Sequence, residues 1–306
     1  PESHSASFAL LVYVSCWLKR HEPAIFTWAL LNSQPMGFYA PAQLVQDLRR
    51  HNVEVRPVDL RYSDWDSALE PYGDQQLALR LGLRQVKSVR EQSVQQFIAG
   101  RQHSESLVQG LRHFSRGELT ALAAANALQG IAAHRHLAQW QVLGIERLPG
   151  LLAQAEFDDA EPVLAAPSET QDLVADYAHV GLTLGRHPIA LLRPKFDRLR
   201  THTAADLENL NHGRFVRVAG LVVNRQRPGT ASGVIFMTLE DETGFTNVVV
   251  WPWVVEKQRR LVVSAKLLLV QGKVEREGRV IHLVAGKLYD HTPWLGRLSS
   301  RSRDFH

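Results

Sequence analysis

The sequence has almost no cysteine and no long hydrophobic run. Cys16 is the only cysteine among 306 residues, so an internal disulfide is excluded, and we expect a reducing compartment with Cys16 as a core filler. No apolar stretch reaches the roughly 18 residues that suggest a membrane helix, although 45% of the residues are hydrophobic. No secretory signal pattern opens the chain. These absences predict a soluble, cytoplasmic protein with no membrane partner.

The signatures of several enzyme classes are also missing. There is no Walker-type glycine loop and no dinucleotide fingerprint. His134 and His136 are two residues apart on an expected helix and would face different directions, so no metal site is predicted. The run from Ser3 to Ser5 places serine beside His4, but no nucleophile elbow or orienting acid accompanies it, and a hydrolase is a weak alternative. We expect no self-contained catalytic centre.

Positive charge is concentrated in the last third of the chain. Residues 213–306 hold 15 Lys and Arg against 8 Asp and Glu, whereas residues 1–212 hold 20 against 23. A local positive field steers a polyanion and gives salt-dependent affinity. The alternative is a basic surface that only maintains solubility. Nucleic acid is therefore the first partner to consider.

The same region has the pattern of a small β-barrel. Apolar residues alternate from 214 to 223, and further strands are expected at 234–239, 245–253, 267–275 and 280–289, with a helix at 254–264. Strand, strand, strand, helix, strand, strand is the order of an OB-fold. Aromatic residues on its second and third strands are candidates for stacking on bases, although aromatics in a small barrel are often core. The barrel candidates for nucleic-acid contact are Arg225, Arg227, Phe236, Trp251, Trp253, Lys257 and Lys273.

Trp251 and Trp253 are expected to share one face of the third strand. Pro252 between them cannot donate a ladder hydrogen bond, which predicts a strand edge or a bulge there. We favour the four basic residues over the tryptophans as nucleic-acid contacts.

The rest of the chain is mainly helical. Residues 1–52 carry helical spacing, with Pro41 able to occupy a first helical turn, and residues 53–72 are expected to be irregular. Helices are predicted at 75–81, 89–100, 107–114, 117–126 and 133–143, and later at 170–184 and 204–210. Residues 146–176, with three prolines and five acidic residues between Glu156 and Glu169, are typical of a linker.

Two of the expected helical hairpins, at residues 83–91 and 128–135, could bind phosphate. In such a hairpin the backbone N–H groups at the start of the second helix point outward, where they suit a phosphate. Helical hairpins are common and usually structural, so both interpretations stay open. The candidate contacts are Lys87, Ser88, Arg90, Gly130, His134 and Arg135.

With these pieces in place, the N-terminal sequence closely resembles a known family. Residues 1–13, followed by Trp17-Leu18-Lys19 and His21-Glu22-Pro23-Ala24, resemble the fingers of bacterial C-family DNA polymerases, the polymerase III α-subunit group. Residues 32–39 and 300–306 resemble the error-prone, damage-inducible branch more specifically. The resemblance covers essentially the whole chain and is weakest at 146–170.

The resemblance implies a multidomain α+β fold, with mainly α-helical fingers and a tandem helix-hairpin-helix followed by an all-β OB-fold barrel. It implies fingers at 1–72, a duplex-binding helix-hairpin-helix domain at 73–145, a linker with packing helices at 146–211, an OB-fold for single-stranded template at 212–291, and a tail at 292–306. Ser3, His4, Ser5 and Lys19 would then lie near the incoming nucleotide or primer end.

The family's metal-binding carboxylates belong to the palm, which nothing here matches. Mg²⁺ would therefore be bound outside this chain. We expect the natural chain to continue upstream of Pro1, and we expect the present chain to bind DNA without extending primers.

Two departures from the family pattern qualify these expectations. Ser88 and Arg90 stand where the family usually has a glycine pair, which affects how closely the hairpin backbone approaches a phosphate. Residues 154–157 keep a glutamine and one aromatic of the sliding-clamp peptide but lack its apolar partner. Clamp binding is thus expected to be indirect, through accessory mutagenesis proteins. A stand-alone nucleic-acid-binding module is the alternative, and the fingers motif at 1–24 argues against it.

Overall fold

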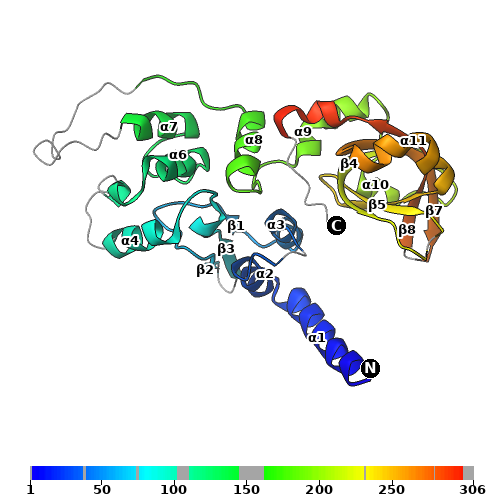
Figure 1. Cartoon of the computed structure of the whole chain (residues 1–306), viewed down its shortest axis with the longest axis horizontal. Coiled ribbons are helices and arrows are strands. Elements are labelled where there is room, and N and C mark those ends of the chain that lie inside the picture. The colour runs from blue at the N-terminus through cyan, green and yellow to red at the C-terminus, as the bar shows by residue number, and fades with distance from the viewer. Residues whose placement is uncertain are drawn as a thin grey trace, which may run out of the picture. The chain divides into compact units, whose positions relative to one another are not determined.

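The chain forms two compact units, Pro1–Leu184 and Gly185–His306 (Figure 1). The computed structural model describes residues 2–36, 39–73, 76–101, 110–144, 162–230, 232–278 and 280–298. Each unit has its own hydrophobic core, and the second unit has an additional small cluster where a helix packs on its barrel. The multidomain α+β prediction is confirmed.

Three helices open the first unit: α1 (Glu2–His21), α2 (Pro23–Asn32) and α3 (Pro41–Arg50). Proline occupies the first turn of both α2 and α3, as expected for Pro41. Backbone N–H groups in the first turn have no acceptor within the helix, so the missing N–H of proline costs no helical hydrogen bond there. Every side chain of α1 from His4 to Trp17 is exposed. Cys16 is therefore a surface residue, and its assignment to the core was wrong.

A three-stranded sheet follows, with β3 in the middle: β1 (Val55–Arg56), β2 (Ala68–Tyr72) and β3 (Gln76–Arg80). Two predictions were wrong here, because residues 53–72 are not all irregular and residues 76–80 are not helical. A run as short as 75–81 fits helical and strand spacing equally well. Pairing with β1, about 20 residues upstream, and with the adjacent strand β2 decides the outcome, and the buried side chains of Ala78 and Leu79 hold β3 in the core.

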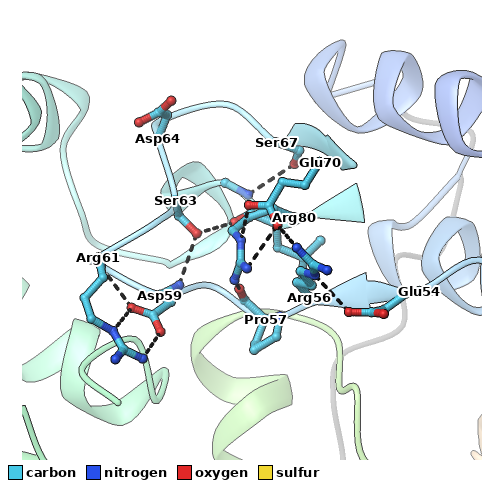
Figure 2. A network of polar contacts seen from close by, with 12 residues as sticks. Glu54, Arg56, Pro57, Asp59, Arg61, Ser63, Asp64, Ser67, Glu70 and Arg80 are labelled. Atoms are coloured by element: carbon cyan, nitrogen blue, oxygen red, sulfur yellow. Dashed lines mark hydrogen bonds and ion pairs between the residues drawn. The ribbon is translucent and has the colours of Figure 1, made fainter. Parts of the chain in front are cut away.

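Arginine and glutamate side chains cross this sheet. The Glu70 carboxylate on β2 accepts hydrogen bonds from Arg80 on the neighbouring strand β3 and from Arg56 on β1, beyond it (Figure 2). The Arg80 Nε–Glu70 Oε1 distance is 2.6 Å. Hydrogen bonds from Arg80 lower the pKa of Glu70 against the opposing effect of burial, with Arg56 contributing further. Opposite charges facing each other across strands stabilise the register of the sheet.

Short helices follow in the described part of the first unit. They are η1 (Leu83–Gln85), α4 (Glu91–Arg101), η2 (Leu111–His113), α6 (Arg116–Ala124), α7 (Arg135–Gly144) and α8 (Glu169–His179). The two predicted hairpins are present, one leading into α4 and one joining α6 to α7. The predicted helix at 107–114 lies partly outside the described residues, as does most of the linker, including residues 154–157.

The second unit is a closed five-stranded barrel with strand order β4-β5-β6-β8-β7. Its elements are α9 (Pro188–Asp197), α10 (Ala204–Leu207), β4 (Phe215–Gln226), β5 (Ile235–Glu240), β6 (Phe245–Val250), α11 (Pro252–Ser264), β7 (Leu267–Glu277), β8 (Val280–Asp290) and η4 (Thr292–Leu298). The predicted order of strands and helix is confirmed. Helix α9 packs on the outside of the barrel through Ile189 and Phe196.

The third strand of the barrel ends earlier than predicted. β6 stops at Val250, Trp251 is the N-cap residue of α11, and Pro252 is its first helical residue. Pro252 therefore marks neither a strand edge nor a bulge. Its fixed φ and missing N–H suit the first position of a helix better than any position in a ladder.

One buried carboxylate joins the beginnings of two helices in the first unit. Glu118 is 2% exposed, and its Oε1 accepts from the Arg90 backbone N–H at 3.0 Å, just before α4. Its Oε2 accepts from the backbone and hydroxyl of Ser115, which caps α6. Burial alone would raise the pKa of Glu118, but the hydrogen bonds from Arg90 and Ser115 outweigh it and hold the pKa far below 4.5.

We predict that Glu118→Gln lowers the unfolding free energy of the first unit by about 1–3 kcal/mol at neutral pH, since buried donors lose a charged acceptor. Because the folded-state pKa is depressed, the wild-type contribution is present above pH 4.5 and is lost as the pH falls below it. Hydrogen exchange of α4 and α6 measures the change, with the exposed Glu91→Gln as control. Equal protection in both variants would contradict this role.

Candidate nucleic-acid interface

One end of the β5–β6 pair brings together several of the predicted barrel residues. Phe236 pairs with Val249 across the two strands, and Trp251 follows Val249 by two residues. A Cβ at Gly233 would lie 3.6 Å from Pro252 Cγ and 3.9 Å from Arg227 Nη2. The β4–β5 loop that carries Arg227 therefore lies against the start of α11, next to the tryptophans.

The aromatic side chains of this cluster face solvent. Phe236 is 39% exposed, Trp251 47% and Trp253 51%, so none of them is a core residue. Lys257 Nζ lies 5.8 Å from the centre of the Trp253 ring, within cation–π range. We call Arg227, Phe236, Trp251, Trp253 and Lys257 the aromatic end of the barrel. Flat exposed rings beside positive charges suit stacked bases and a phosphate backbone.

Lys273 belongs to a different part of the barrel surface. It lies on β7, half-buried, where it pairs with Phe215 on β4 and with Val284 on β8. Phe215 is 72% exposed and was not among the predicted contacts. The sequence did carry a signal for it, because Phe215 and Arg217 alternate with buried valines along the strand.

Arg225 has a structural role. Its Nε donates to the Val262 carbonyl at 2.7 Å, and its Nη2 donates to the Ala265 carbonyl. Both carbonyls lie at the end of α11, where helix geometry leaves acceptors without partners. This arrangement does not fit the predicted role of Arg225 as a nucleic-acid contact, since the guanidinium is turned onto the helix end.

The first hairpin also uses its lysine structurally. Lys87 Nζ donates to the carbonyls of Tyr177 and Ala178, at 3.0 and 2.8 Å, and thereby caps α8. Ser88 has a φ of +68°, the left-handed conformation that a glycine would adopt easily. Arg90 pairs with Glu118, and its side chain remains 69% exposed. The tight turn is thus kept without glycine, and Lys87 is exposed but spends two of its donors on the end of α8.

In the second hairpin, Arg135 is a buried structural residue. Its side chain is 5% exposed and donates to the Ala124 carbonyl at 2.8 Å and to Asp176 at 2.6 Å, and it pairs with Asp172 at 3.0 Å. A phosphate contact by Arg135 does not fit this burial. The buried role of Arg135 could not be predicted from the sequence, because its carboxylate partners come from α8, about 40 residues away.

His134 and Gly130 occupy distinct positions in the same hairpin. His134 Nδ1 accepts from the Leu137 backbone N–H at 3.3 Å, and its Nε2 lies 3.2 Å from the Leu164 carbonyl, to which it donates. Both ring nitrogens are therefore engaged. Gly130 is exposed in the turn, and within the described residues its backbone N–H has no hydrogen-bond acceptor.

The candidates near the N-terminus all lie on α1. His4 contacts the Phe8 ring at 4.4 Å between centroids, and Lys19 pairs with Asp47 on α3 at 2.9 Å. His4 and Ser5 are exposed, while the Ser3 side chain lies outside the described residues. Nothing in these contacts tests a role near a nucleotide.

Neither a metal centre nor a membrane helix is found in the parts of the chain that the structure describes. No group of three or more His, Cys, Asp or Glu side chains there could hold a metal ion. None of the helices within those ranges has the length and apolar character needed to cross a membrane.

Comparison with known proteins identifies the domains and the family. Residues 216–290 match an OB-fold nucleic acid binding domain, and residues 52–138 match a helix-hairpin-helix motif. Over its whole length the chain is 57% identical to an error-prone DNA polymerase of Alkalilimnicola ehrlichii and 51% identical to one of Pseudomonas fluorescens. The chain corresponds to a segment of an error-prone DNA polymerase. It spans about 30% of the length of these relatives.

Solved structures add little. An asparaginyl-tRNA synthetase from Pyrococcus horikoshii matches 29% of this chain and 22% of its own, at 25% identity, with a TM-score of 0.26. That score is too low to support a conclusion about function.

In this error-prone polymerase segment, we predict that Arg135→Met destabilises the first unit by about 3 kcal/mol, because two carboxylates and a helix-end carbonyl lose their partner. Burial and then the charges of Arg135 and Lys87 lower the pKa of His179. The variant should therefore also show a His179 pKa closer to 6.5, measured by NMR. The exposed Arg116→Met is the control, and an unchanged His179 pKa in Arg135→Met would contradict the assignment.

Proposed function

We propose that this chain is the C-terminal, DNA-handling part of an error-prone DNA polymerase that extends primers by template-directed dNTP addition during damage-induced translesion synthesis. The OB-fold barrel binds single-stranded template, and the two hairpins bind primed duplex. The observation that carries the proposal is the family relationship over the whole chain, combined with an exposed aromatic and basic cluster on a nucleic-acid-binding barrel.

The aromatic end of the barrel supports binding of a single strand. Bases of a single strand are unpaired and can stack on exposed rings, which contributes roughly 1–3 kcal/mol per base. Arg227 and Lys257 lie beside these rings and supply positive charge for the backbone. Duplex DNA keeps its bases stacked internally, so this arrangement favours the single strand.

The hairpins support binding of duplex backbone. Their turns are tight, with Ser88 left-handed in the first and Gly130 open to solvent in the second. Backbone N–H groups in such turns recognise phosphates without reading sequence. That property suits a polymerase that has to hold any primed template.

Catalysis is assigned to the remainder of the polymerase. Two-metal phosphoryl transfer needs carboxylates that hold Mg²⁺, and the described residues offer no such group. Mg²⁺ would be bound by carboxylates outside this segment. Ser3, His4, Ser5 and Lys19 on α1 would then lie toward the nucleotide or primer end.

Recruitment is proposed to occur through accessory mutagenesis proteins, with the sliding clamp engaged indirectly, in the bacterial cytoplasm. The remaining alternative is a stand-alone module of OB-fold and hairpins. The 57% identity to a polymerase across the entire chain, including the helices before residue 52, disfavours that alternative.

We predict that Phe236→Ala and Trp253→Ala each weaken single-stranded DNA binding about tenfold or more, since each removes a stacking surface. Fluorescence anisotropy with a labelled oligonucleotide measures the affinity, and binding to primed duplex through the hairpins should persist. The control is Phe245→Ala, which removes an exposed ring at the opposite end of the same strand pair. Equal losses in all three variants, or none, would refute stacking at the aromatic end.

The 306-residue chain should not incorporate dNTPs on a primed template with Mg²⁺, although it binds that template. A gel-based primer-extension assay checks this, with a complete error-prone polymerase as positive control. Extension by this chain alone would overturn the assignment of catalysis to the remainder of the protein.

A further inference from the structure

Arg61 lies in a loop of the sheet region, yet it packs on the turn of the second hairpin. A Cβ added at Gly130 would fall 2.3 Å from Arg61 Cδ and 2.5 Å from Arg61 Nε. Only glycine therefore leaves room for this side chain. The loop is anchored there by the Leu60 backbone N–H, which donates to the Ala127 carbonyl at 2.8 Å.

A buried carboxylate holds the Arg61 guanidinium in one orientation. Asp59 is 4% exposed and accepts from Arg61 Nε at 3.1 Å and from Nη2 at 2.7 Å (Figure 2). The guanidinium also lies 5.0 Å from the centre of the exposed Tyr62 ring. A group fixed in this way loses little conformational freedom on meeting an anion.

The outer edge of the guanidinium is open. The Arg61 side chain is 40% exposed, and among the described residues its Nη1 has no hydrogen-bond partner. The Gly130 backbone N–H beside it is likewise without an acceptor in those ranges. Two unused donors thus lie together at an exposed turn, and one of them carries a full positive charge.

We propose that Arg61 completes the phosphate-binding site of the second hairpin, with Nη1 and the Gly130 turn contacting the backbone of duplex DNA. The inference rests on the proposed duplex-binding function of the hairpins. It replaces the buried Arg135 with a cation from a segment about 70 residues upstream. The glycine is then required for the position of Arg61 as well as for access to its own N–H.

The test is a double-mutant cycle in the 306-residue chain, read by anisotropy on primed duplex across a salt series. Arg61→Ala and Gly130→Ala should each weaken binding about ten- to hundredfold, the effect of losing one charge-assisted hydrogen bond. Each should lower the salt slope by about 0.9, the contribution of one phosphate contact. The double variant should lose less affinity than the product of the two single losses, because Gly130→Ala also displaces Arg61 and the two changes share that contact.

Two further variants separate binding from folding. Arg61→Gln keeps a donor for Asp59 but removes the charge. This variant should retain thermal stability, and its salt slope for duplex binding should still be lower than that of the wild type by about 0.9. Arg49→Ala removes an exposed charge at the end of α3 and should change affinity less than twofold. If Arg61→Ala and Arg61→Gln match Arg49→Ala while wild type binds duplex, the role of Arg61 is refuted and the proposed function stands. If wild type does not bind duplex at all, both fail.

Discussion

The carbonyl groups at the ends of helices impose a constraint on this structure. The last turn of a helix leaves several backbone carbonyls without intrahelical donors, and they also carry the negative end of the helix dipole. Among the described residues, arginine and lysine side chains from elsewhere in the chain meet this need at several helix ends. They are Arg84 after α2, Arg135 at α6, Lys87 at α8, Arg276 at α10 and Arg225 at α11.

This constraint divides the basic residues into two groups. Those that cap helices join distant segments: Arg135 ties α6 to α8, and Lys87 ties the first hairpin to the end of α8. Those that remain at the surface, such as Arg227 and Lys257, are available to a polyanion. The net charge of a region therefore overstates the charge that DNA can contact.

The sequence predicted local features better than distant ones. The barrel was predictable because its strands alternate over six to twelve residues and are separated by clear turns. The sheet at 55–80 was not, because its strands have only two to five residues and the central strand is also selected by parallel pairing with β1, which no local pattern signals. Phe236 could be chosen from its strand position, whereas Trp253 lies on α11 and not on the predicted strand. The burial of Arg135 depends on carboxylates of α8, and the place of Arg61 depends on the turn at Gly130.

The most direct test of the division between capping and surface cations is the salt dependence of single-stranded DNA binding. The surface set is Arg227→Ala, Lys257→Ala and Lys273→Ala together, and the capping set is Arg225→Ala with Arg276→Ala. The surface set should lower the salt slope by about 2, at roughly 0.7 per phosphate contact, and leave the melting temperature unchanged. The capping set should lower the melting temperature and keep the slope. The reverse result, with the slope lost in the capping set and kept in the surface set, would contradict the account.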